Sequence, residues 1–520
     1  MIVSAPFGPV AGRVIDTPDG GVATFLGLPY ADAPGPSTRF RVTAAGAGHR
    51  QVIDATSPAP SVPQDPDVFR AMLGMPPDPW SEVGSLSANV WAPVGAESLP
   101  VMVWVHGGGY VGGSNSSPRT DGARLAAAGH VIVVALSYRL GVFGFLPAFA
   151  ELGEGFEDAA NLGILDLIAG LEWVRENVAA FGGDPALVTV FGESAGAAAV
   201  GTMLGMPRAR GLFRRAIMQS GTAERVRTPD QAAEVSARFL RASGLTPETA
   251  RVLLDWPAER VLDAQRAFTS VVAAESVGIP LPYQPVIDGR SIPRLPLDAV
   301  RDGAGSEVDL IVGTNLNEGS FFTTMGEPGT LTDDRFSEAL DTLARQNFPH
   351  RLSAETTSAY RTELGRELGR EPSLTEIVEA FLSDVQYRQP SNRLLEARAV
   401  ASARTYSYLF SWPSPTVPGL GSCHTMDLPF VFRQLDHVDN MPLVGDDPPI
   451  ALSEAMSGAW AAFAATGEPV VPGTRWPAYD LYRRATLGWD TGVEVKDDPR
   501  GRLRRWWVDA RAESVAAPAS

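Results

Sequence analysis

A serine set between two glycines is the first group in this chain whose surroundings could make it reactive. Residues 191–196 are Phe-Gly-Glu-Ser-Ala-Gly, with the apolar run 187–190 before them and the small residues 197–200 after them. A strand, a tight turn and a helix in this order form a nucleophile elbow, which exposes the Ser194 hydroxyl and points the first helical N–H groups at its target. With 52 glycines in the chain, a chance match is the alternative, and the strand and helix context argues against it.

A second glycine-rich loop could supply hydrogen-bond donors to the same reaction. The apolar run 101–105 predicts a strand covered on both faces, and it leads directly into residues 106–110, His-Gly-Gly-Gly-Tyr. Backbone N–H groups left free in such a loop can hold the oxygen that becomes negative during acyl transfer. We therefore interpret the loop as an oxyanion hole. The rivals are a phosphate-binding loop, whose Gly-Lys-Ser/Thr ending does not follow here, and a plain flexible loop.

A serine nucleophile requires a base, and His424 is the best placed of the six histidines. It lies in a turn after the strand-like run 405–412, although a structural loop histidine is the alternative for it in isolation. His106 belongs to the glycine loop, where a structural role fits better. Cys423 lacks an elbow and is interpreted as a packing residue. We expect the other histidines at the surface: His49, His130, His350 and His437.

The base needs a carboxylate to orient it, and Glu318 is the candidate. It lies in a loop just past the short apolar run 310–313, although a solvated loop glutamate is the alternative. Ser194, Glu318 and His424 each follow a predicted strand. Their order along the chain is the nucleophile, acid, base order of α/β-hydrolases.

The alternation of apolar strand runs with helical stretches predicts the architecture. It favours a large, mostly parallel, twisted sheet with helices on both faces and the site at the carboxyl ends of the strands. Turn signals in the first forty residues predict a small antiparallel sheet, and residues 55–84 predict a long surface excursion.

Capping signals at Thr228 predict helices across residues 228–275, and a second helical insertion is expected at about 330–400. No linker-like composition divides the chain. We therefore expect one catalytic domain over residues 1–510 and a flexible tail over 511–520.

Composition excludes several function classes. The formal net charge of −17 argues against nucleic acid and anionic membrane surfaces as partners. The single cysteine permits no intrachain disulfide, and no apolar run is long enough to span a membrane. We expect a soluble cytoplasmic protein, since the first residues lack the pattern of a signal peptide.

Further motifs in the same order show that the sequence resembles the type-B carboxylesterases, the family that also holds cholinesterases and bacterial p-nitrobenzyl esterases, to which it is closest in character. The match runs nearly end to end. It includes the elbow, the glycine loop and the segments at residues 27–31, 89–91, 138–141, 181–185, 219–221, 317–319, 427–432 and 476–477.

The resemblance implies the α/β-hydrolase fold and roles for individual residues. Ser194 would be the nucleophile, His424 the base and Glu318 its partner, at the bottom of a gorge. No metal or organic cofactor is implied, and the partner would be a small-molecule ester. The oxyanion-hole N–H groups would come from Gly108, Gly109 and Ala195.

Two positions depart from the family pattern. Ser85 stands where many relatives have a disulfide cysteine, which is consistent with an intracellular member. Met75 stands where cholinesterases have a tryptophan, which argues against a preference for choline esters.

The leading hypothesis is a serine carboxylesterase that works through an acyl-enzyme. A specialised hydrolase of aryl, carbamate or polyester-like substrates would use the same triad. A non-catalytic recognition protein of the cholinesterase-like fold is the third alternative, and the intact serine, glutamate and histidine argue against it.

Overall fold

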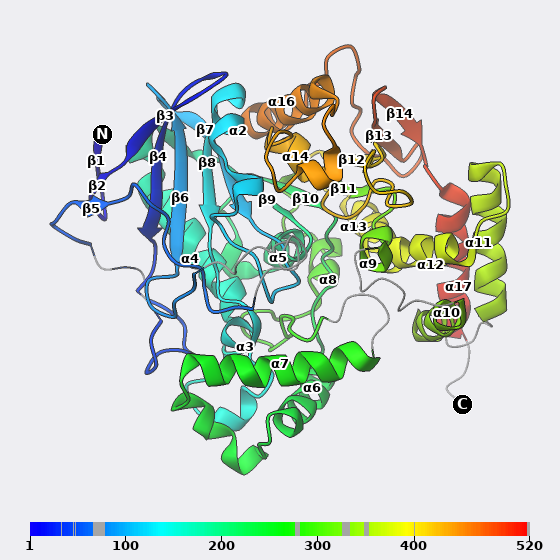
Figure 1. Ribbon diagram of the computed structural model, residues 1–520, viewed down its shortest axis with the longest axis horizontal. Helices are drawn as coiled ribbons and strands as arrows, with labels where there is room; N and C mark the ends of the chain where they lie inside the picture. Colours follow the sequence, from blue (N-terminus) through cyan, green and yellow to red (C-terminus); the bar gives the residue numbers. More distant parts are fainter. Residues whose placement is uncertain are drawn as a thin grey trace.

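A large twisted sheet runs through the molecule and helices cover both of its faces (Figure 1). The computed structural model describes residues 1–516 except 33, 45, 47, 66–78, 276–280, 325–332, 348–352 and 400. Met75 and His350 therefore lie outside the described residues.

The sheet has eleven strands, parallel in its middle and antiparallel at both edges, among the described residues. All neighbours from β8 to β13 are parallel, and the antiparallel pairs are β13–β14, β8–β6, β6–β4 and β4–β3. The predicted α/β architecture is confirmed. In spatial order the strands are β14 (Glu494–Asp497), β13 (Ala485–Trp489), β12 (Thr405–Phe410), β11 (Asp309–Asn315), β10 (Arg215–Gln219), β9 (Gly183–Glu193), β7 (Leu99–Val105), β8 (Ile132–Leu136), β6 (Ser87–Pro93), β4 (Gly20–Pro29) and β3 (Arg13–Thr17).

Strand β7 shows why a central strand is apolar at every position. Val101, Val103 and Val105 belong to one buried cluster, whereas Met102 and Trp104 belong to another on the opposite face. Side chains alternate between the faces of a sheet, so both faces need apolar residues when helices cover both.

Two sets of helices provide these covers. On the face of Met102 and Trp104 lie α2 (Ala123–Gly129), α14 (Leu428–Val431) and α16 (Ile450–Thr466). On the other lie α4 (Leu162–Asn177), α5 (Ala195–Leu204), α8 (Pro296–Arg301) and α13 (Gln389–Arg398). Short elements connect them: α3 (Gly141–Gly144), α9 (Ser320–Thr324), α15 (Met441–Val444) and the 3₁₀ turns Pro118–Thr120, Ala150–Leu152, Val178–Phe181 and Pro207–Ala209.

The predicted small N-terminal sheet is present, but its composition differs from the expectation. Strands β1 (Ile2–Ala5) and β2 (Gly8–Ala11) are antiparallel, and β5 (Ile53–Asp54) joins β2 in parallel. The hairpin β3–β4 instead extends the large sheet, because β4 pairs with β6. Val22 and Phe25 of β4 are buried, which ties this hairpin to the main core.

The first predicted helical insertion consists of α6 (Pro229–Ala242), the 3₁₀ segment Pro247–Leu254 and α7 (Ala258–Glu275). A capping box between Thr228 and Gln231 starts α6, as the sequence predicts. Helix α7 is fixed to α3 by Gln265 Oε1, which accepts a hydrogen bond from Val142 N at 3.0 Å.

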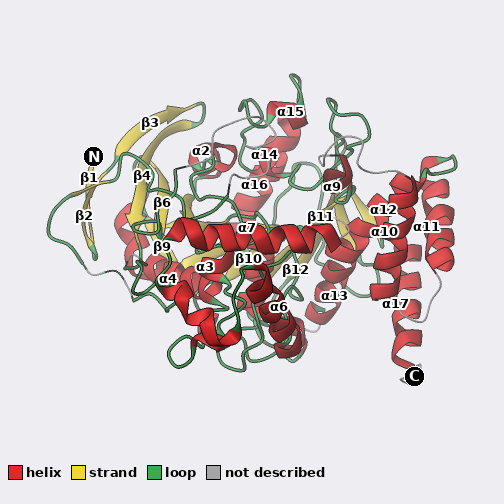
Figure 2. Ribbon diagram, turned by 60° about the horizontal axis from the view of Figure 1, so that its bottom comes forward, coloured by secondary structure: helices red, strands yellow, loops and turns green. Residues whose placement is uncertain are grey.

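The second insertion consists of α10 (Asp333–Asn347), α11 (Ser353–Leu368) and α12 (Leu374–Ser383), which a π-helical turn (Asp384–Arg388) joins to α13. Figures 1 and 2 both place α10, α11 and α12 beside α17 (Gly501–Ala516), at the end of the molecule opposite to β1 and β2.

Helix α17 continues to Ala516, so residues 511–516 of the expected tail are helical. Trp507 of this helix stacks on Phe381 of α12 with 5.6 Å between ring centroids. Its indole N–H donates to the Tyr360 hydroxyl at 2.7 Å. Burial of this aromatic face holds α17 against α12.

None of the helices among the described residues is both long enough and apolar enough to cross a membrane.

Candidate active site

Ser194 occupies a strained turn between β9 and α5. Its backbone has φ +54° and ψ −119°, a conformation that residues other than glycine rarely adopt. The flanking glycines are required by close packing: a Cβ on Gly196 would lie 2.0 Å from Val105 O, and one on Gly192 2.7 Å from Gly196 C. Ser194 is half-buried, whereas Glu193 and Ala195 on either side are buried. The strand, turn and helix that the sequence predicts here are confirmed.

The glycine loop lies directly against this turn. A Cβ on Gly107 would come within 2.7 Å of Glu193 Oε2 and 3.1 Å of Ser194 Cβ. Gly108 has φ +111°, and a Cβ there would lie 2.1 Å from Gly112 O. The loop can therefore approach the serine only because it carries no side chains at these positions.

A segment expected at the surface holds this loop in place. Gln64 and Gly113 exchange two hydrogen bonds: Gln64 Nε2 donates to Gly113 O and Gly113 N donates to Gln64 Oε1, both at 2.9 Å. Gln64 is only 7% exposed, and Ser61 and Val62 are buried as well. The expected surface excursion over residues 55–84 is wrong for this part, because Ser61, Val62 and Gln64 are buried and the Gln64 side chain binds the backbone just after the glycine loop.

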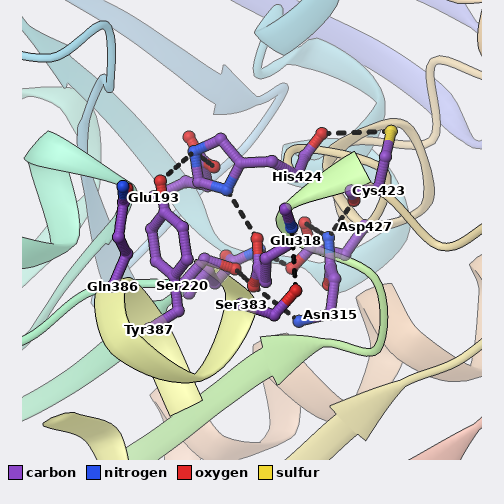
Figure 3. Close-up of polar contacts among 12 residues, drawn as sticks. Glu193, Ser220, Asn315, Glu318, Ser383, Gln386, Tyr387, Cys423, His424 and Asp427 are labelled. Atoms are coloured by element: carbon purple, nitrogen blue, oxygen red, sulfur yellow. Dashed lines mark hydrogen bonds and ion pairs between the residues drawn. The ribbon is translucent and has the colours of Figure 1, made fainter. Parts of the chain in front are cut away.

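His424 and Glu318 meet at the carboxyl edge of the sheet (Figure 3). His424 Nδ1 lies 2.6 Å from Glu318 Oε2, and both side chains are almost completely buried. The other oxygen of Glu318 accepts hydrogen bonds from Ser220 Oγ at 2.5 Å and Asn315 N at 2.7 Å. These donors fix the carboxylate, and the carboxylate in turn fixes the imidazole with Nδ1 as its donor.

The second imidazole nitrogen faces a second buried carboxylate. Glu193 Oε1 lies 3.1 Å from His424 Nε2 (Figure 3). This is an ion-pair distance without hydrogen-bond alignment, since Glu193 Oε1 has no hydrogen-bond partner among the described residues. Burial, opposed by the charge of His424, raises the pKa of Glu193 to about 8.

The two carboxylates also determine the proton affinity of the imidazole. Burial would lower the pKa of His424, but the charges of Glu193 and Glu318 outweigh it, and the pKa is raised from 6.5. His424 and Glu193 thus both hold protons more tightly than in water, and the pair titrates as a unit.

The loop that carries His424 is anchored by a neighbouring polar cluster. Asn315 Nδ2 donates to Cys423 O at 2.7 Å. Asp427 accepts hydrogen bonds from Gln219 Nε2 at 2.8 Å and from the Tyr408 hydroxyl at 2.9 Å. Cys423 is fully buried, and burial raises the pKa of its thiol, which supports a packing role rather than that of a nucleophile.

The remaining histidines lie in other surroundings. His106 is buried, stacks on Tyr138 with 4.5 Å between centroids and has its pKa lowered to about 4 by burial. It stays neutral and supports the glycine loop. His130 is exposed, whereas His49 and His437 are half-buried rather than fully at the surface.

Aromatic side chains surround the imidazole. Phe321 and Phe322 lie 6.2 Å and 5.4 Å from the His424 ring. Tyr387 packs closer, at 4.7 Å between centroids, and its hydroxyl lies 3.5 Å from His424 Nε2.

Sequence reasoning did not assign Glu193, Ser220 or Tyr387 to the site. Ser220 directly follows β10 at the carboxyl edge of the sheet, a position that could have marked it. Glu193 lies inside the elbow motif, but its partner is 231 residues away in sequence. Tyr387 lies within a long helical stretch and carries no signal of its own.

Comparison with known proteins identifies the family of the chain. The model of the carboxylesterase family matches residues 1–506. The chain belongs to the carboxylesterase family. It is a carboxylic ester hydrolase with the α/β-hydrolase fold, and it acts on small-molecule esters.

Individual relatives cover nearly the whole carboxylesterase chain. It is 36% identical to the para-nitrobenzyl esterase of Bacillus subtilis over 516 residues, which is 99% of each chain. It is 32% identical to the phenmedipham hydrolase of Pseudarthrobacter oxydans, covering 92% of this chain and 94% of that one. The crystal structure of a Geobacillus stearothermophilus carboxylesterase superposes with a TM-score of 0.83 at 35% identity, covering 97% of this chain and 99% of that one.

Proposed function

We propose that this carboxylesterase hydrolyses its substrate through an acyl-enzyme on Ser194, with His424 as the base and Glu318 as its orienting partner. The observation that carries the proposal is the position of His424, whose Nδ1 is bound to Glu318 at 2.6 Å while its other nitrogen faces the elbow residue Glu193 at 3.1 Å. Such an imidazole has one nitrogen fixed as a donor and one free to exchange protons.

In the acylation step, Ser194 Oγ forms a bond to the ester carbonyl carbon while its proton passes to His424 Nε2. The C–O bond to the alcohol then breaks, and His424 returns the proton to the alcohol oxygen. In deacylation, a water oxygen forms a bond to the acyl carbon while its proton passes to His424. The bond from that carbon to Ser194 Oγ then breaks, His424 returns the proton to Oγ, and the acid leaves.

We further propose that the N–H groups of Gly108, Gly109 and Ala195 hold the carbonyl oxygen while it is negative. The positive φ of both glycines and the close approach of the loop to Ser194 support this assignment. Ala195 is the first residue of α5, so its N–H is not used within the helix. These steps use protein groups alone, and we propose that no metal or organic cofactor takes part.

Strands of the main sheet come from residues 13 to 497, and the candidate site draws on β9, β11 and the loop after β12. We therefore propose that residues 1–510 act as one catalytic domain.

The test is a Ser194→Ala substitution assayed on p-nitrophenyl and p-nitrobenzyl esters, the second chosen after the name of the Bacillus relative. We expect kcat to fall on the order of a millionfold. The Ser194 side chain is half-buried at a turn, so thermal unfolding should change little. A variant that keeps more than a few per cent of the parent activity would show that another residue is the nucleophile.

A further inference from the structure

The π-helical turn Asp384–Arg388 brings a phenol to the reacting groups. Tyr387 is 2% exposed, and its ring lies over the His424 imidazole at 4.7 Å and 33°. Its hydroxyl is 3.5 Å from His424 Nε2. The roles assigned to the triad and the oxyanion hole make no use of this hydroxyl.

The turn has an identifiable cause. Pro390 has no N–H to donate to the carbonyl four residues earlier, which belongs to Gln386. Arg225 Nη2 donates to this carbonyl instead, at 3.2 Å. The backbone is thereby allowed a wider turn, of the kind that often occurs at functional sites.

Neighbouring side chains fix the Tyr387 ring. The Arg225 guanidinium lies 5.7 Å from the ring centroid. Phe322 stacks on the ring at 6.3 Å and 17°. With His424 also packed against the ring, the hydroxyl has little freedom to leave its position near the imidazole nitrogen.

The Tyr387 hydroxyl keeps its proton. Burial raises its pKa from 10.0, and the charge of Arg225 only partly offsets this effect. The phenol is therefore a neutral hydrogen-bond donor throughout the pH range in which the imidazole changes charge.

The position of this donor indicates which oxygen it serves. His424 must reach both Ser194 Oγ and the departing alcohol oxygen with the same nitrogen, because it takes a proton from one and gives it to the other. A hydroxyl that lies 3.5 Å from that nitrogen, on a ring packed against the imidazole, is placed beside the alcohol oxygen that the nitrogen protonates.

We propose that the Tyr387 hydroxyl is a further catalytic group, which donates a hydrogen bond to the alcohol oxygen as its bond to carbon breaks. The proton that the alcohol acquires comes from His424, and the phenol keeps its own. This inference rests on the proposed acyl-enzyme mechanism.

The proposal makes the contribution of Tyr387 depend on the leaving group. A p-nitrophenolate is a weak base that departs without assistance, whereas an alkoxide carries concentrated charge and gains more from a donor. Removal of the hydroxyl should therefore slow esters of basic alcohols selectively.

The experiment compares Tyr387→Phe with the parent on acetate esters of p-nitrophenol, phenol, benzyl alcohol and ethanol. We expect kcat/KM to fall less than about threefold for the p-nitrophenyl ester. For the benzyl and ethyl esters we expect a fall of roughly tenfold to a hundredfold, the scale of a hydrogen bond to a charged group. An equal loss for all four esters would overturn the proposal, because a structural role slows every ester alike.

Tyr360→Phe is the matched control. Tyr360 donates to Asp384 of the same turn at 2.5 Å and packs on Phe381 of α12. Its loss should lower the unfolding temperature but leave the relative rates of the four esters unchanged, and a shift like that of Tyr387→Phe would assign the effect to the turn as a whole.

Labelling separates this inference from the proposed function. An organophosphate should modify one serine in the parent and in Tyr387→Phe but none in Ser194→Ala. If the parent is not labelled, the acyl-enzyme mechanism fails. If labelling is normal and the four esters lose rate equally, only the role of Tyr387 fails.

Discussion

Two buried acid–base pairs lie near the carboxyl edge of the same sheet, and they differ in how completely their hydrogen bonds are used. Arg139, just past β8, binds Asp166 of α4 through two side-chain hydrogen bonds at 2.6 and 2.7 Å, and its backbone N–H adds a third at 3.1 Å. His424 has one carboxylate firmly bound, Glu318, and another, Glu193, that faces it with an oxygen lacking any hydrogen-bond partner among the described residues.

This difference distinguishes a structural ion pair from a pair that can take part in a reaction. The arginine is always charged, so its pair with Asp166 is a fixed dipole that ties α4 to the chain after β8. The imidazole can change its charge, and the open oxygen of Glu193 leaves room for a proton to move. A buried pair with every atom satisfied indicates a structural role, whereas one with an open, titratable partner indicates a site.

Among variants of these two pairs, we expect the largest effect from Glu318→Gln, on kcat. A glutamine amide can donate to Nδ1, which would favour the imidazole tautomer that carries its proton on Nε2 and cannot act as a base. We expect kcat to fall about 10⁴-fold, measured by steady-state kinetics on a p-nitrophenyl ester. Full activity in this variant would assign the orienting role to another carboxylate.

Asp166→Asn should have the opposite profile. It leaves the buried Arg139 charge unpaired, so we expect a loss of about 3–5 kcal/mol in the free energy of unfolding, measured by denaturant titration. The folded fraction should retain kcat within a few-fold.

The exposed pair of Arg124 and Asp436, whose carboxylate side chain is 70% exposed, provides the control. Asp436→Asn should cost less than about 1 kcal/mol. A similar cost for both aspartates would mean that burial does not distinguish them.

The smallest expected effect is a displaced pH profile in Glu193→Gln. The Glu193 carboxylate favours the protonated imidazole, so its removal should lower the pKa of His424. Because only the neutral imidazole is a base, kcat/KM should begin its rise at lower pH than in the parent.

In the parent enzyme, the midpoint of that rise should lie above 6.5. Glu379→Gln is the control for the Glu193 variant, since burial raises the pKa of this carboxyl to about 7 without contact with the imidazole. A displaced pH profile in Glu379→Gln, or an unchanged one in Glu193→Gln, would contradict the conclusion that Glu193 raises the pKa of His424.

The parts of the fold that follow from local rules could be predicted from the sequence. Each of three such features can be recognised within a few neighbouring residues: the apolar run 101–105, the Thr228 capping box and the glycines at 192 and 196. The candidate triad could be found because each member follows a strand end, and parallel strands present those ends at one edge.

Other features depend on contacts between distant segments and could not be predicted. Gln64 lies in a stretch rich in proline and polar residues, and only the fold places it against Gly113. The hairpin β3–β4 has the same local signals in either sheet, and its pairing with β6 decides the outcome. Tyr387 depends on Pro390 and Arg225 acting together, which no helical periodicity reveals.

The burial of Cys423 makes its thiol a reporter of how often the surrounding loop opens. This cysteine is the only one in the chain, is fully buried and precedes His424 in the loop that Asn315 anchors. A thiol reagent can reach the sulfur only while that loop is open, so the rate of modification reports how often the loop opens. The opening of the site can thus be measured at the sulfur of Cys423, without a substrate and without an introduced probe.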